Sequence, residues 1–554
     1  MGLYLLDYGA GNVQSLANSL KKLGYHFTWV SHPDDFLKAT SLVFPGVGAF
    51  ETAVNHLVSR GLFEPLRQYV QSGKPYFGIC IGMQILFQSS AESTVPGLGV
   101  IPSPVERFDD KEKAVPHIGW NAARPVSTQP DGPAQPPYYY FVHSYCAKHQ
   151  PERHPEASGW AYTTTQYGDE TFISSVRQGN IFGTQFHPEK SGPAGLALLG
   201  AWLANYREVA LIHPIPASTL VSSPEFTLTK RIIACMDVRT NDEGDLVVTK
   251  GDQYDVREKV DPDPGTTTNP SGAVRNLGKP VALASRYYEA GADELCLLNI
   301  TSFRLSPLQD QPMLAVVRAA AECVFVPLTI GGGIKDTTDP DGTKRSALEV
   351  AGAYFRAGAD KVSIGSEAVY AVERLRAQGK PDGASAIETI AHTYGRQAVV
   401  VSVDPRRVYV DPKSYDGPYH DEIISGDTSG LENDKGKAWW YQCTVSGGRE
   451  ARQLSVVQLV QGVETLGAGE ILLNSIDRDG TGLGFDIALV SLVKRSVKIP
   501  VVASSGAGAS QHFVDLFKNT SAEAALAAGI FHRELVGISE VKERLMREGV
   551  RTRI

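Results

Sequence analysis

The chain has 554 residues, of which 42% are hydrophobic and 21% are charged, and its net charge is -8 at pH 7. This length exceeds what one hydrophobic core accommodates and predicts two to four domains of ~150 residues each. The composition is typical of a globular protein, and the acidic balance gives no electrostatic reason to expect nucleic acid or an anionic membrane as a partner.

The six cysteines are scattered, with no C-x-x-C pair and no neighbouring histidine cluster: Cys80, Cys146, Cys235, Cys296, Cys323 and Cys443. This pattern favours a reduced compartment, and we expect no disulfide framework, no metal and no cofactor. The first residues, MGLYLLD, are typical of a β-strand, and no apolar run approaches the ~20 residues that a membrane span needs. A cytosolic enzyme is therefore expected, and a plastid location would require a transit peptide that is missing from this chain.

In the first part of the chain, short apolar runs alternate with stretches of helical spacing. Strands that end in glycine turns are predicted at residues 2–9, 41–48 and 75–82, and further strands near 138–145 and 181–189. Helices are predicted at 13–24 and 82–92, and residues 126–137 read as a proline-rich surface loop. The alternation indicates an α/β domain.

A break follows at about residues 207–229, where HPIPASTLVSSPEF is rich in proline and serine and has no amphipathic period. We therefore expect a first domain at 1–206, a linker at 207–228 and a second domain at 229–554. After the break, eight apolar strands separated by helical segments predict a (β/α)8 barrel. These strands begin near Arg231, Glu294, Phe325, Lys361, Ala398, Glu470, Pro500 and Ala524.

The barrel sequence also repeats itself at nearly one spacing. GADELCLLNI recurs as GAGEILLNSI, LTIGGGI recurs as VASSGAG, and IIACMDV is mirrored by VVVSVDP. Three matches in the same order indicate two half-barrels of four units each. Insertions rich in Pro, Gly and Asp lie at 261–272, 336–345 and 411–441. The first and last of these follow strands one and five, so we expect them at the catalytic face as lids.

Three motifs of the first domain together suit nucleophilic catalysis. Gly78–Gly82 has the form of a nucleophile elbow with Cys80 at its centre, although a buried core cysteine is the alternative for this motif alone. His187 follows a strand, and Glu189 is placed to orient it, although an isolated His-Pro-Glu is more often a surface turn. The glycines around Val47, with the N–H of Ile81, are suited to line an oxyanion hole.

In combination, PGVGAF, GICIGMQ, HSY and QFHPEKS resemble the triad glutamine amidotransferases of class I, in residue and order, over residues 1–205. The resemblance implies that Cys80 is the nucleophile, His187 the general base and acid, and Glu189 the orienting acid. PHIGWN resembles the histidine-pathway branch of that family. The positions that match glutamine-binding residues are Gly48, Gln84, Glu92, Ser144 and Tyr145.

In the barrel, Asp237 ends the first strand and Asp404 the fifth, on opposite sides of the mouth. This placement suits general acid and base catalysis, with a helix N-cap as the alternative for either residue alone. Glycine-rich turns follow strands three and seven, at 331–333 and 504–508, and 365–366 and 528–529 follow strands four and eight. Two symmetric turn pairs predict a long substrate with a phosphate at each end.

The barrel resembles the cyclase subunit of the imidazole glycerol phosphate synthases in KRIIACMDV, PLTIGGGI, ADKVSIGS, QAVVVSVDPRRV, GAGEILLNSIDRDGTGLG and AEAALAAGIFH. The fused order is similar to that of the fungal and plant enzymes of histidine biosynthesis. The implied reaction joins ammonia from glutamine to a bis-phosphorylated ribotide (PRFAR), giving imidazole glycerol phosphate and AICAR, with Asp237 and Asp404 as acid and base.

The positions implied to hold the substrate and its phosphates are Lys250, Gly332, Gly333, Gly365, Ser366, Asp477, Asp479, Gly480, Thr481, Ser504, Ser505, Gly506, Gly508 and Gly529. Two positions depart from the bacterial pattern: Ser505 stands where Gly is frequent, and Asn299 stands where Asp is frequent. These departures concern the ribose contacts and leave the reaction unchanged.

Four charges mark the strand starts on the opposite, N-terminal face of the barrel: Arg231, Glu294, Lys361 and Glu470. An ion-pair network that closes the barrel floor is the alternative from the pattern alone. The resemblance implies a gate for ammonia, with Lys190 and Asp360 forming an interdomain salt bridge near it. We therefore expect the two domains to interact within one monomeric chain.

Three other functions fit part of the pattern. The isomerase barrel of the same pathway shares the two aspartates and two phosphate sites, but it has no use for a glutaminase. A vitamin B6 synthase barrel needs Schiff-base lysines, and no strand-end lysine fills that role. A catalytically dead regulatory barrel is disfavoured by the presence of both Asp237 and Asp404.

Overall fold

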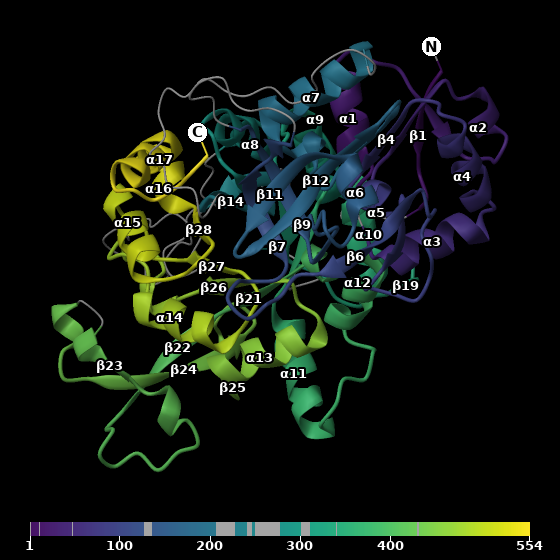
Figure 1. Cartoon of the computed structure of the whole chain (residues 1–554). Helices are drawn as coiled ribbons and strands as arrows, with labels where there is room; N and C mark the ends of the chain where they lie inside the picture. Colours follow the sequence, from purple (N-terminus) through teal and green to yellow (C-terminus); the bar gives the residue numbers. More distant parts are fainter. Residues whose placement is uncertain are drawn as a thin grey trace.

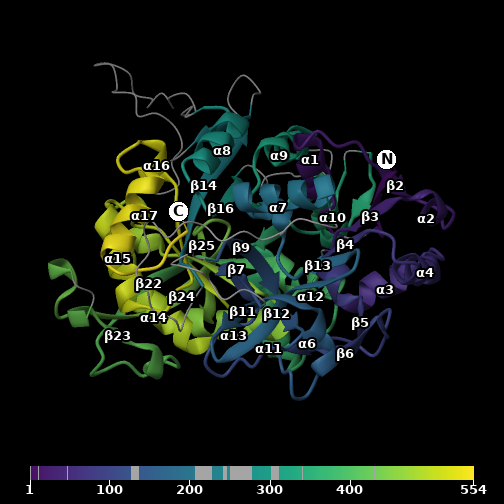
Figure 2. The same cartoon turned by 45° about the horizontal axis from the view of Figure 1, so that its top comes forward.

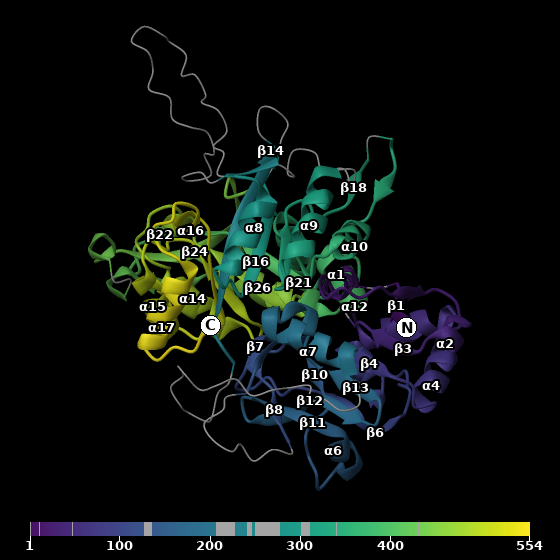
Figure 3. The same cartoon turned by 90° about the horizontal axis from the view of Figure 1, so that it is seen from above.

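A computed structural model of the chain describes residues 2–9, 11–46, 48–126, 136–205, 228–240, 246–249, 278–300, 311–339, 341–428 and 431–553. These residues form two α/β units that lie side by side (Figures 1 and 3). The N-terminal unit is purple to blue, and the C-terminal unit runs from teal to yellow. Among the helices of these residues, none is long and apolar enough to cross a membrane.

The N-terminal unit is built on an eight-stranded mixed sheet of order β2-β1-β3-β4-β13-β12-β11-β8. Pairing is parallel from β2 to β13 and antiparallel from there to β8. The α/β prediction is confirmed. The strands are β1 (Leu3–Leu6), β2 (Thr28–Val30), β3 (Ser41–Phe44), β4 (Tyr76–Ile79), β8 (Arg124–Pro125), β11 (Ala161–Tyr167), β12 (Glu170–Gln178) and β13 (Ile181–Thr184).

Two smaller sheets and seven helices complete this unit among the described residues. The smaller sheets contain β5 (Phe87–Ser90), β6 (Ile101–Arg107) and β10 (Tyr145–Cys146), and β7 (His117–Ala122) with β9 (Tyr138–His143). The helices are α1 (Gln14–Lys22), α2 (Asp35–Lys38), α3 (Phe50–Ser59), α4 (Phe63–Gln71), α5 (Ile81–Gln84), α6 (Pro155–Trp160) and α7 (Gly192–Asn205).

The predicted helix at 82–92 is wrong. The helix α5 ends at Gln84, and β5 follows from Phe87 to Ser90. Carbonyls of Ile85 and Leu86 accept backbone N–H groups from residues 98–101 instead of continuing a helix. Pairing with a distant segment therefore overrides the weak local helical pattern.

The C-terminal unit is a closed barrel of eight parallel strands, in which β28 pairs with β14. The barrel prediction is confirmed, and the largest shift in a strand start is at β17, which begins at Leu328 instead of Phe325 because Pro327 has no N–H for the ladder. The strands are β14 (Arg231–Thr240), β16 (Glu294–Asn299), β17 (Leu328–Gly331), β20 (Lys361–Ile364), β21 (Val399–Val403), β26 (Glu470–Asn474), β27 (Val501–Ser504) and β28 (Ala524–Ala527). The hairpin strand β15 (Leu246–Thr249) pairs with β14.

Helices surround the barrel, and α14 to α17 lie on the flank farthest from the N-terminus (Figure 2). Capping boxes begin three of the helices: Ser346 with Glu349, Ser385 with Glu388, and Ser455 with Gln458. The helices are α8 (Pro280–Glu289), α9 (Gln311–Cys323), α10 (Ala347–Ala357), α11 (Ser366–Gln378), α12 (Ala386–Tyr394), α13 (Val456–Leu466), α14 (Ile487–Ser496), α15 (Ser510–Asn519), α16 (Gly529–His532) and α17 (Ile538–Arg547).

Residues of β14 alternate between two apolar layers. Ile232, Ala234 and Met236 belong to the large core between strands and helices, whereas Ile233 and Cys235 belong to a small cluster with residues of the other strands. Because side chains of a strand alternate between its faces, Arg231 and Asp237 share the inward face with that cluster. One face of one strand therefore carries a charge at the floor and a carboxylate at the mouth, six residues or roughly 20 Å apart.

The half-barrel repeat extends to backbone conformation. Gly332 and Gly506, at equivalent places after β17 and β27, both have φ of 92°. Gly291 and Gly467, which precede β16 and β26, have φ of 90° and 106°. Left-handed values favour glycine, so both halves require it at the same turns.

The insertion at 411–441 adopts strands that the sequence did not indicate. Residues after β21 form a small antiparallel sheet that projects from the barrel (Figure 1). The insertion at 336–345 includes a short hairpin, and the one at 261–272 lies outside the described residues. The added strands are β18 (Thr337–Thr338), β19 (Lys344–Arg345), β22 (Pro405–Val410), β23 (Ile424–Ser425), β24 (Ala438–Val445) and β25 (Glu450–Ser455).

Candidate functional site

The parallel pairing of β4 with β13 brings the predicted triad together. Ile79 lies opposite Thr184, so Cys80 and His187 emerge at the same end of the sheet. The Cys80 N–H also donates to the Thr184 carbonyl at 2.7 Å. The register of two strands about a hundred residues apart therefore sets the proposed nucleophile beside its proposed base.

Cys80 lies on a strained turn between β4 and α5. Its φ is 49° and its ψ is −103°, in a region that residues with a side chain rarely occupy. A Cβ at Gly46 would collide with the Ile81 nitrogen, and a Cβ at Gly82 would collide with the Phe44 carbonyl. Gly46 and Gly82 therefore permit the close backbone approaches that this turn needs.

His187 is linked to Glu189 by a bond of 2.8 Å between Nδ1 and Oε1, and both side chains are buried. Burial opposes protonation of the ring, but the charges of Glu189 and Cys80 outweigh it and raise the pKa of His187 to about 10. A protonated imidazole beside the sulfur favours the thiolate, which is the nucleophilic form of cysteine.

The predicted oxyanion hole is described only in part, because Val47 lies outside the described residues. Ile81 is the first residue of α5, directly after Cys80, so its N–H lies at a helix N-terminus. Gly48 has φ of 147°, and a Cβ there would be 3.7 Å from the Thr393 carbonyl of the barrel. Gly48, the neighbour of the proposed oxyanion donor Val47, therefore borders the other domain.

The residues predicted to hold glutamine fall into two groups. Gln84 links Cys80 to Tyr145: its backbone N–H donates to the Cys80 carbonyl at 2.9 Å, and its side-chain amide donates to the Tyr145 carbonyl at 3.0 Å. The hydroxyl of Ser144 is buried and has no hydrogen-bond partner among the described residues. Glu92 contacts a different segment: it accepts the Phe50 N–H at the start of α3, at 2.8 Å. Burial raises the pKa of Glu92 above its usual range.

A small cavity of about 20 Å³ lies between the two domains. One water-sized molecule needs about 10–15 Å³ of such space, so the cavity accommodates a single molecule of this size. Its lining includes two residues of the proposed triad, Cys80 and His187, on one side and the barrel floor on the other. The lining residues are Gly46, Gly48, Cys80, Tyr140, Val142, His187, Lys190, Asp360, Lys361, Gln397 and Ala398.

The four charged residues at the strand starts form a closed ring of ion pairs. The Arg231 guanidinium lies 2.7 Å from Glu294 and 2.6 Å from Glu470, and Lys361 Nζ lies 2.7 Å from each glutamate. All four side chains are at most 2% exposed. Burial alone would lower the pKa of Lys361, but the two glutamates together raise it. Tyr140 of the N-terminal unit donates to Glu294 at 3.1 Å.

Several polar contacts join the domains around this ring. Lys190 Nζ lies 2.7 Å from Asp360, as the sequence predicted, and Asn12 also donates to Asp360 at 2.8 Å. Asn18 of α1 donates to a carbonyl of α9 at 2.9 Å, where Figure 3 shows the two helices side by side. Trp120 donates to the Asp293 carbonyl at 3.2 Å. The proposed glutaminase site therefore faces the barrel floor.

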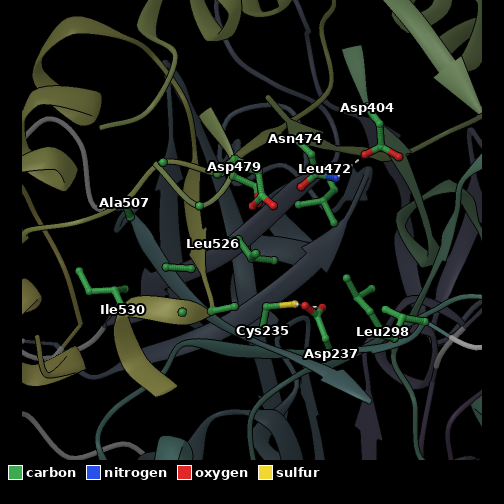
Figure 4. Close-up of a pocket in the computed structure, with 18 of the residues that line it drawn as sticks. Cys235, Asp237, Leu298, Asp404, Leu472, Asn474, Asp479, Ala507, Leu526 and Ile530 are labelled. Atoms are coloured by element: carbon green, nitrogen blue, oxygen red, sulfur yellow. Dashed lines mark hydrogen bonds between the residues drawn. The ribbon is translucent and has the colours of Figure 1, made fainter. Parts of the chain in front are cut away.

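The opposite end of the barrel holds a cavity of about 390 Å³, within the range of small-molecule sites. Asp237 and Asp404 both line it, and Figure 4 shows them on different sides of the cavity. The Asp404 carboxylate accepts a bond of 2.7 Å from Asn474. Burial raises the pKa of Asp404, the bonds from Asn474 and Ser402 lower it in part, and the charge of Asp479 raises it further.

The predicted substrate-binding residues divide into those that line this cavity and those that do not. Lys250 lies outside the described residues. Among the described residues, Gly332, Gly333, Gly365, Ser366, Asp477 and Thr481 are absent from the lining of this cavity. The residues that line it are Asp479, Gly480, Ser504, Ser505, Gly506, Gly508 and Gly529.

Local contacts account for three of the residues outside the cavity. The Ser366 hydroxyl accepts the Ser446 N–H at 2.9 Å. Ser446 lines the cavity, so the turn that contains Ser446 lies between Ser366 and the cavity. Asp477 accepts the Arg407 N–H at 2.9 Å, and the Thr481 hydroxyl donates to the Arg478 carbonyl at 2.8 Å. These side chains shape the loops around the mouth.

Ser505 has φ of 75°, a left-handed conformation that favours glycine. This explains why glycine suits the position that the sequence marked as a departure. Sequence reasoning missed several residues of the cavity, including Arg239, Arg449, Asn474 and Arg533. Asn474 is the last residue of β26, and Asp404 directly follows β21, so a strand-end position is the signal that could have found Asn474. Arg239 lies on β14, Arg449 and Arg533 lie on loops, and none of the three belongs to a motif.

The chain matches two families of known proteins. Residues 4–203 match glutamine amidotransferase class-I, and residues 231–536 match the family described as histidine biosynthesis protein. Three similar proteins are each named imidazole glycerol phosphate synthase hisHF. The protein of Emericella nidulans is 52% identical over 99% of this chain and 98% of its own length. The protein of Schizosaccharomyces pombe is 52% identical over 98% of both chains. The protein of Arabidopsis thaliana, named as chloroplastic, is 51% identical over 99% of this chain and 89% of its own length.

Proposed function

Because the chain belongs to the family of fused imidazole glycerol phosphate synthases, we propose that it hydrolyses glutamine in its N-terminal domain and consumes the ammonia in its barrel. The barrel reaction joins ammonia to PRFAR and gives imidazole glycerol phosphate and AICAR, in histidine biosynthesis. The domains extend over residues 1–206 and 229–554, with a linker at 207–228. The enzyme acts as a monomer in the cytoplasm.

The small cavity between the domains is the observation that carries this proposal. It touches Cys80 and His187 of one domain and Lys361 of the other. Ammonia released at Cys80 therefore enters a space that adjoins the ring of charges at the barrel floor. Beyond the ring, the inward face of the barrel is lined with apolar residues such as Ile233, Cys235 and Val400, which suit the neutral form of ammonia.

The glutaminase step follows from the geometry around Cys80. The thiolate attacks the amide carbon of glutamine, and the negative oxygen that forms is held by the N–H groups of Ile81 and Val47. His187 gives a proton to the leaving nitrogen, so ammonia departs and a thioester remains. His187 then takes a proton from water, whose oxygen attacks the thioester carbon. The carbon–sulfur bond breaks, which releases glutamate and restores the thiolate. Glu189 keeps the imidazole oriented at 2.8 Å.

The cyclase step takes place at the mouth, where Asp237 and Asp404 face one cavity. The raised pKa of Asp404 makes its carboxylate easier to protonate, which suits a group that gives and takes a proton. The backbone around Gly506 and Gly529 supports one phosphate of PRFAR, and the turns at Gly332 and Gly365 support the other.

Separation of the two chemistries tests this proposal. Cys80→Ala should abolish glutamine-dependent AICAR formation, because no thioester forms, and should retain cyclisation driven by ammonium salts at high pH. Cys146→Ala, which changes another buried cysteine of the same domain, serves as the matched control and should retain both activities. Equal loss of ammonium-driven activity in Cys80→Ala would contradict the assignment of two sites.

A further inference from the structure

Gln185 lies between two residues of the proposed glutaminase site and is fully buried. Its Nε2 atom donates to the Cys80 sulfur at 3.4 Å. Its Oε1 atom accepts from Gln84 Nε2 at 3.0 Å. Thr184 pairs with Ile79 at the ends of β13 and β4, so the residues that follow, Gln185 and Cys80, lie alongside each other.

The direction of these bonds is fixed from outside the site. The Tyr145 carbonyl accepts from Gln84 Nε2 at 3.0 Å and from His143 Nδ1 at 2.8 Å. A carbonyl only accepts, so the Gln84 NH₂ group must face Tyr145 and the neighbouring Gln185 Oε1. The NH₂ group of Gln185 is then left to face the sulfur.

Two buried histidines hold that carbonyl in turn. His143 Nε2 lies 3.1 Å from His117 Nδ1, and His117 Nε2 lies 3.1 Å from the Asn121 amide. Burial lowers the pKa of both histidines, that of His143 to about 3, so both rings are neutral at physiological pH. Asn121 donates to His117, His117 donates to His143, and His143 donates to the carbonyl, so each bond has one direction.

We propose that Gln185 is a positioning residue of the glutaminase, whose N–H bond holds the Cys80 thiolate in place and favours the anion over the thiol. The inference rests on the proposed role of Cys80 as the nucleophile. A hydrogen bond from an N–H group to an anion is stronger than one between neutral groups. The bond from Gln185 adds to the effect of the His187 charge, because His187 also has to give its proton to the leaving group. His187 is the titratable group that faces the sulfur, and Glu189 lies behind it.

Two substitutions of similar size test the bond in the full-length enzyme. Gln185→Met removes the donor. Gln185→Glu keeps an oxygen for the Gln84 N–H but replaces the NH₂ group at the sulfur with a carboxylate oxygen. Gln166→Met is the matched control, because the side-chain amide of Gln166 also makes hydrogen bonds within the glutaminase unit, to Gly168 and Thr171.

The measurement is the rate at which iodoacetamide alkylates Cys80, followed by peptide mass spectrometry from pH 5 to 10. We expect the pH midpoint of this rate to rise by about one unit in Gln185→Met and by more in Gln185→Glu. We also expect kcat for glutamine hydrolysis to fall about tenfold with KM within about twofold. Gln166→Met should keep the wild-type midpoint and rates.

Wild-type midpoints in both Gln185 variants would overturn the proposal. A shift in Gln185→Met with none in Gln185→Glu would also overturn it, because the oxygen would then be what faces the sulfur. Ammonium-driven cyclisation shows whether a variant is folded. If one Gln185 variant loses this activity, the pH midpoint of the other variant tests the proposal. A separate outcome, in which complete alkylation of wild-type Cys80 leaves glutamine hydrolysis intact, would contradict the proposed function instead.

Discussion

Asp404 is partly buried at the barrel mouth, where its carboxylate has one short hydrogen bond, from Asn474. Burial raises its pKa above the value of an aspartate in the unfolded chain. The folded state therefore binds the proton more tightly than the unfolded state does. At pH values above the folded pKa, the ionised carboxylate destabilises the fold, and this cost disappears as pH falls below the unfolded value of ~3.9.

Asp404→Asn should consequently lose cyclisation and gain stability at neutral pH. The amide oxygen still accepts from Asn474, while the charge is gone. The melting temperature at pH 7 is expected to equal or exceed that of the wild type, and the difference should vanish toward pH 4. PRFAR affinity should stay within about tenfold, or ~1.4 kcal/mol.

Thermal unfolding at both pH values, with isothermal titration of PRFAR, checks this prediction. Asp421→Asn changes an exposed carboxylate of the insertion and should alter neither stability nor cyclisation. A less stable Asp404→Asn protein without PRFAR affinity would mark the carboxylate as structural.

At the scale of elements, four barrel strands begin with the charges of the buried ring. Each glutamate contacts both cations, so the ring neutralises itself inside a region with almost no solvent. Removing one partner of a buried ion pair leaves an uncompensated charge, at a cost of about 3–5 kcal/mol.

Lys361→Met should therefore destabilise the protein by about 3–5 kcal/mol in urea unfolding, because both glutamates keep only Arg231. Lys518→Met removes a half-exposed lysine that pairs with Glu548 at 2.6 Å, and it should cost at most about 1 kcal/mol.

The ratio of glutamate released to AICAR formed decides whether the ring is also a gate. A gate for ammonia predicts a ratio near one in the wild type and an excess of glutamate in Lys361→Met, because ammonia escapes. An unchanged ratio in the destabilised variant would leave the ring with a structural role alone.

At the scale of the whole molecule, the residues that follow the proposed oxyanion donor Val47 border the barrel. Gly48 lies near the Thr393 carbonyl, and the Thr52 hydroxyl donates to the His392 carbonyl at 3.4 Å. Both barrel residues belong to α12, which precedes β21 and Asp404 in the chain. A contiguous set of contacts thus joins the barrel to the glutaminase site.

We expect a ligand in the barrel to activate the glutaminase. Val47 lies between two glycines, so its peptide is able to rotate at little steric cost and to form or remove one oxyanion donor. One such donor changes the rate by ~10²–10³. Glutamate release by Asp404→Asn, which consumes no ammonia, should rise at least tenfold when PRFAR is added. Equal rates with and without PRFAR would imply a preformed oxyanion hole.

The sequence by itself determined the elements whose signals are local. Short apolar runs separated by helical segments predicted the eight barrel strands. The half-barrel repeat also predicted the equivalent glycine turns at Gly332 and Gly506. Triad residues were predicted because a cysteine in a glycine elbow and a histidine followed by a glutamate have distinct short motifs.

Only the tertiary structure decided what depends on contacts between distant segments. The strand β5 replaced a predicted helix because its pairing partner lies beyond it in the chain. Gln185 carried no motif of its own, and it became visible when the register of β4 and β13 placed its amide against the Cys80 sulfur. Likewise, the cavity that joins Cys80 to Lys361 exists only because the two domains pack against each other. Pairing register and domain packing are set by the sum of many weak contacts, which no short stretch of sequence encodes.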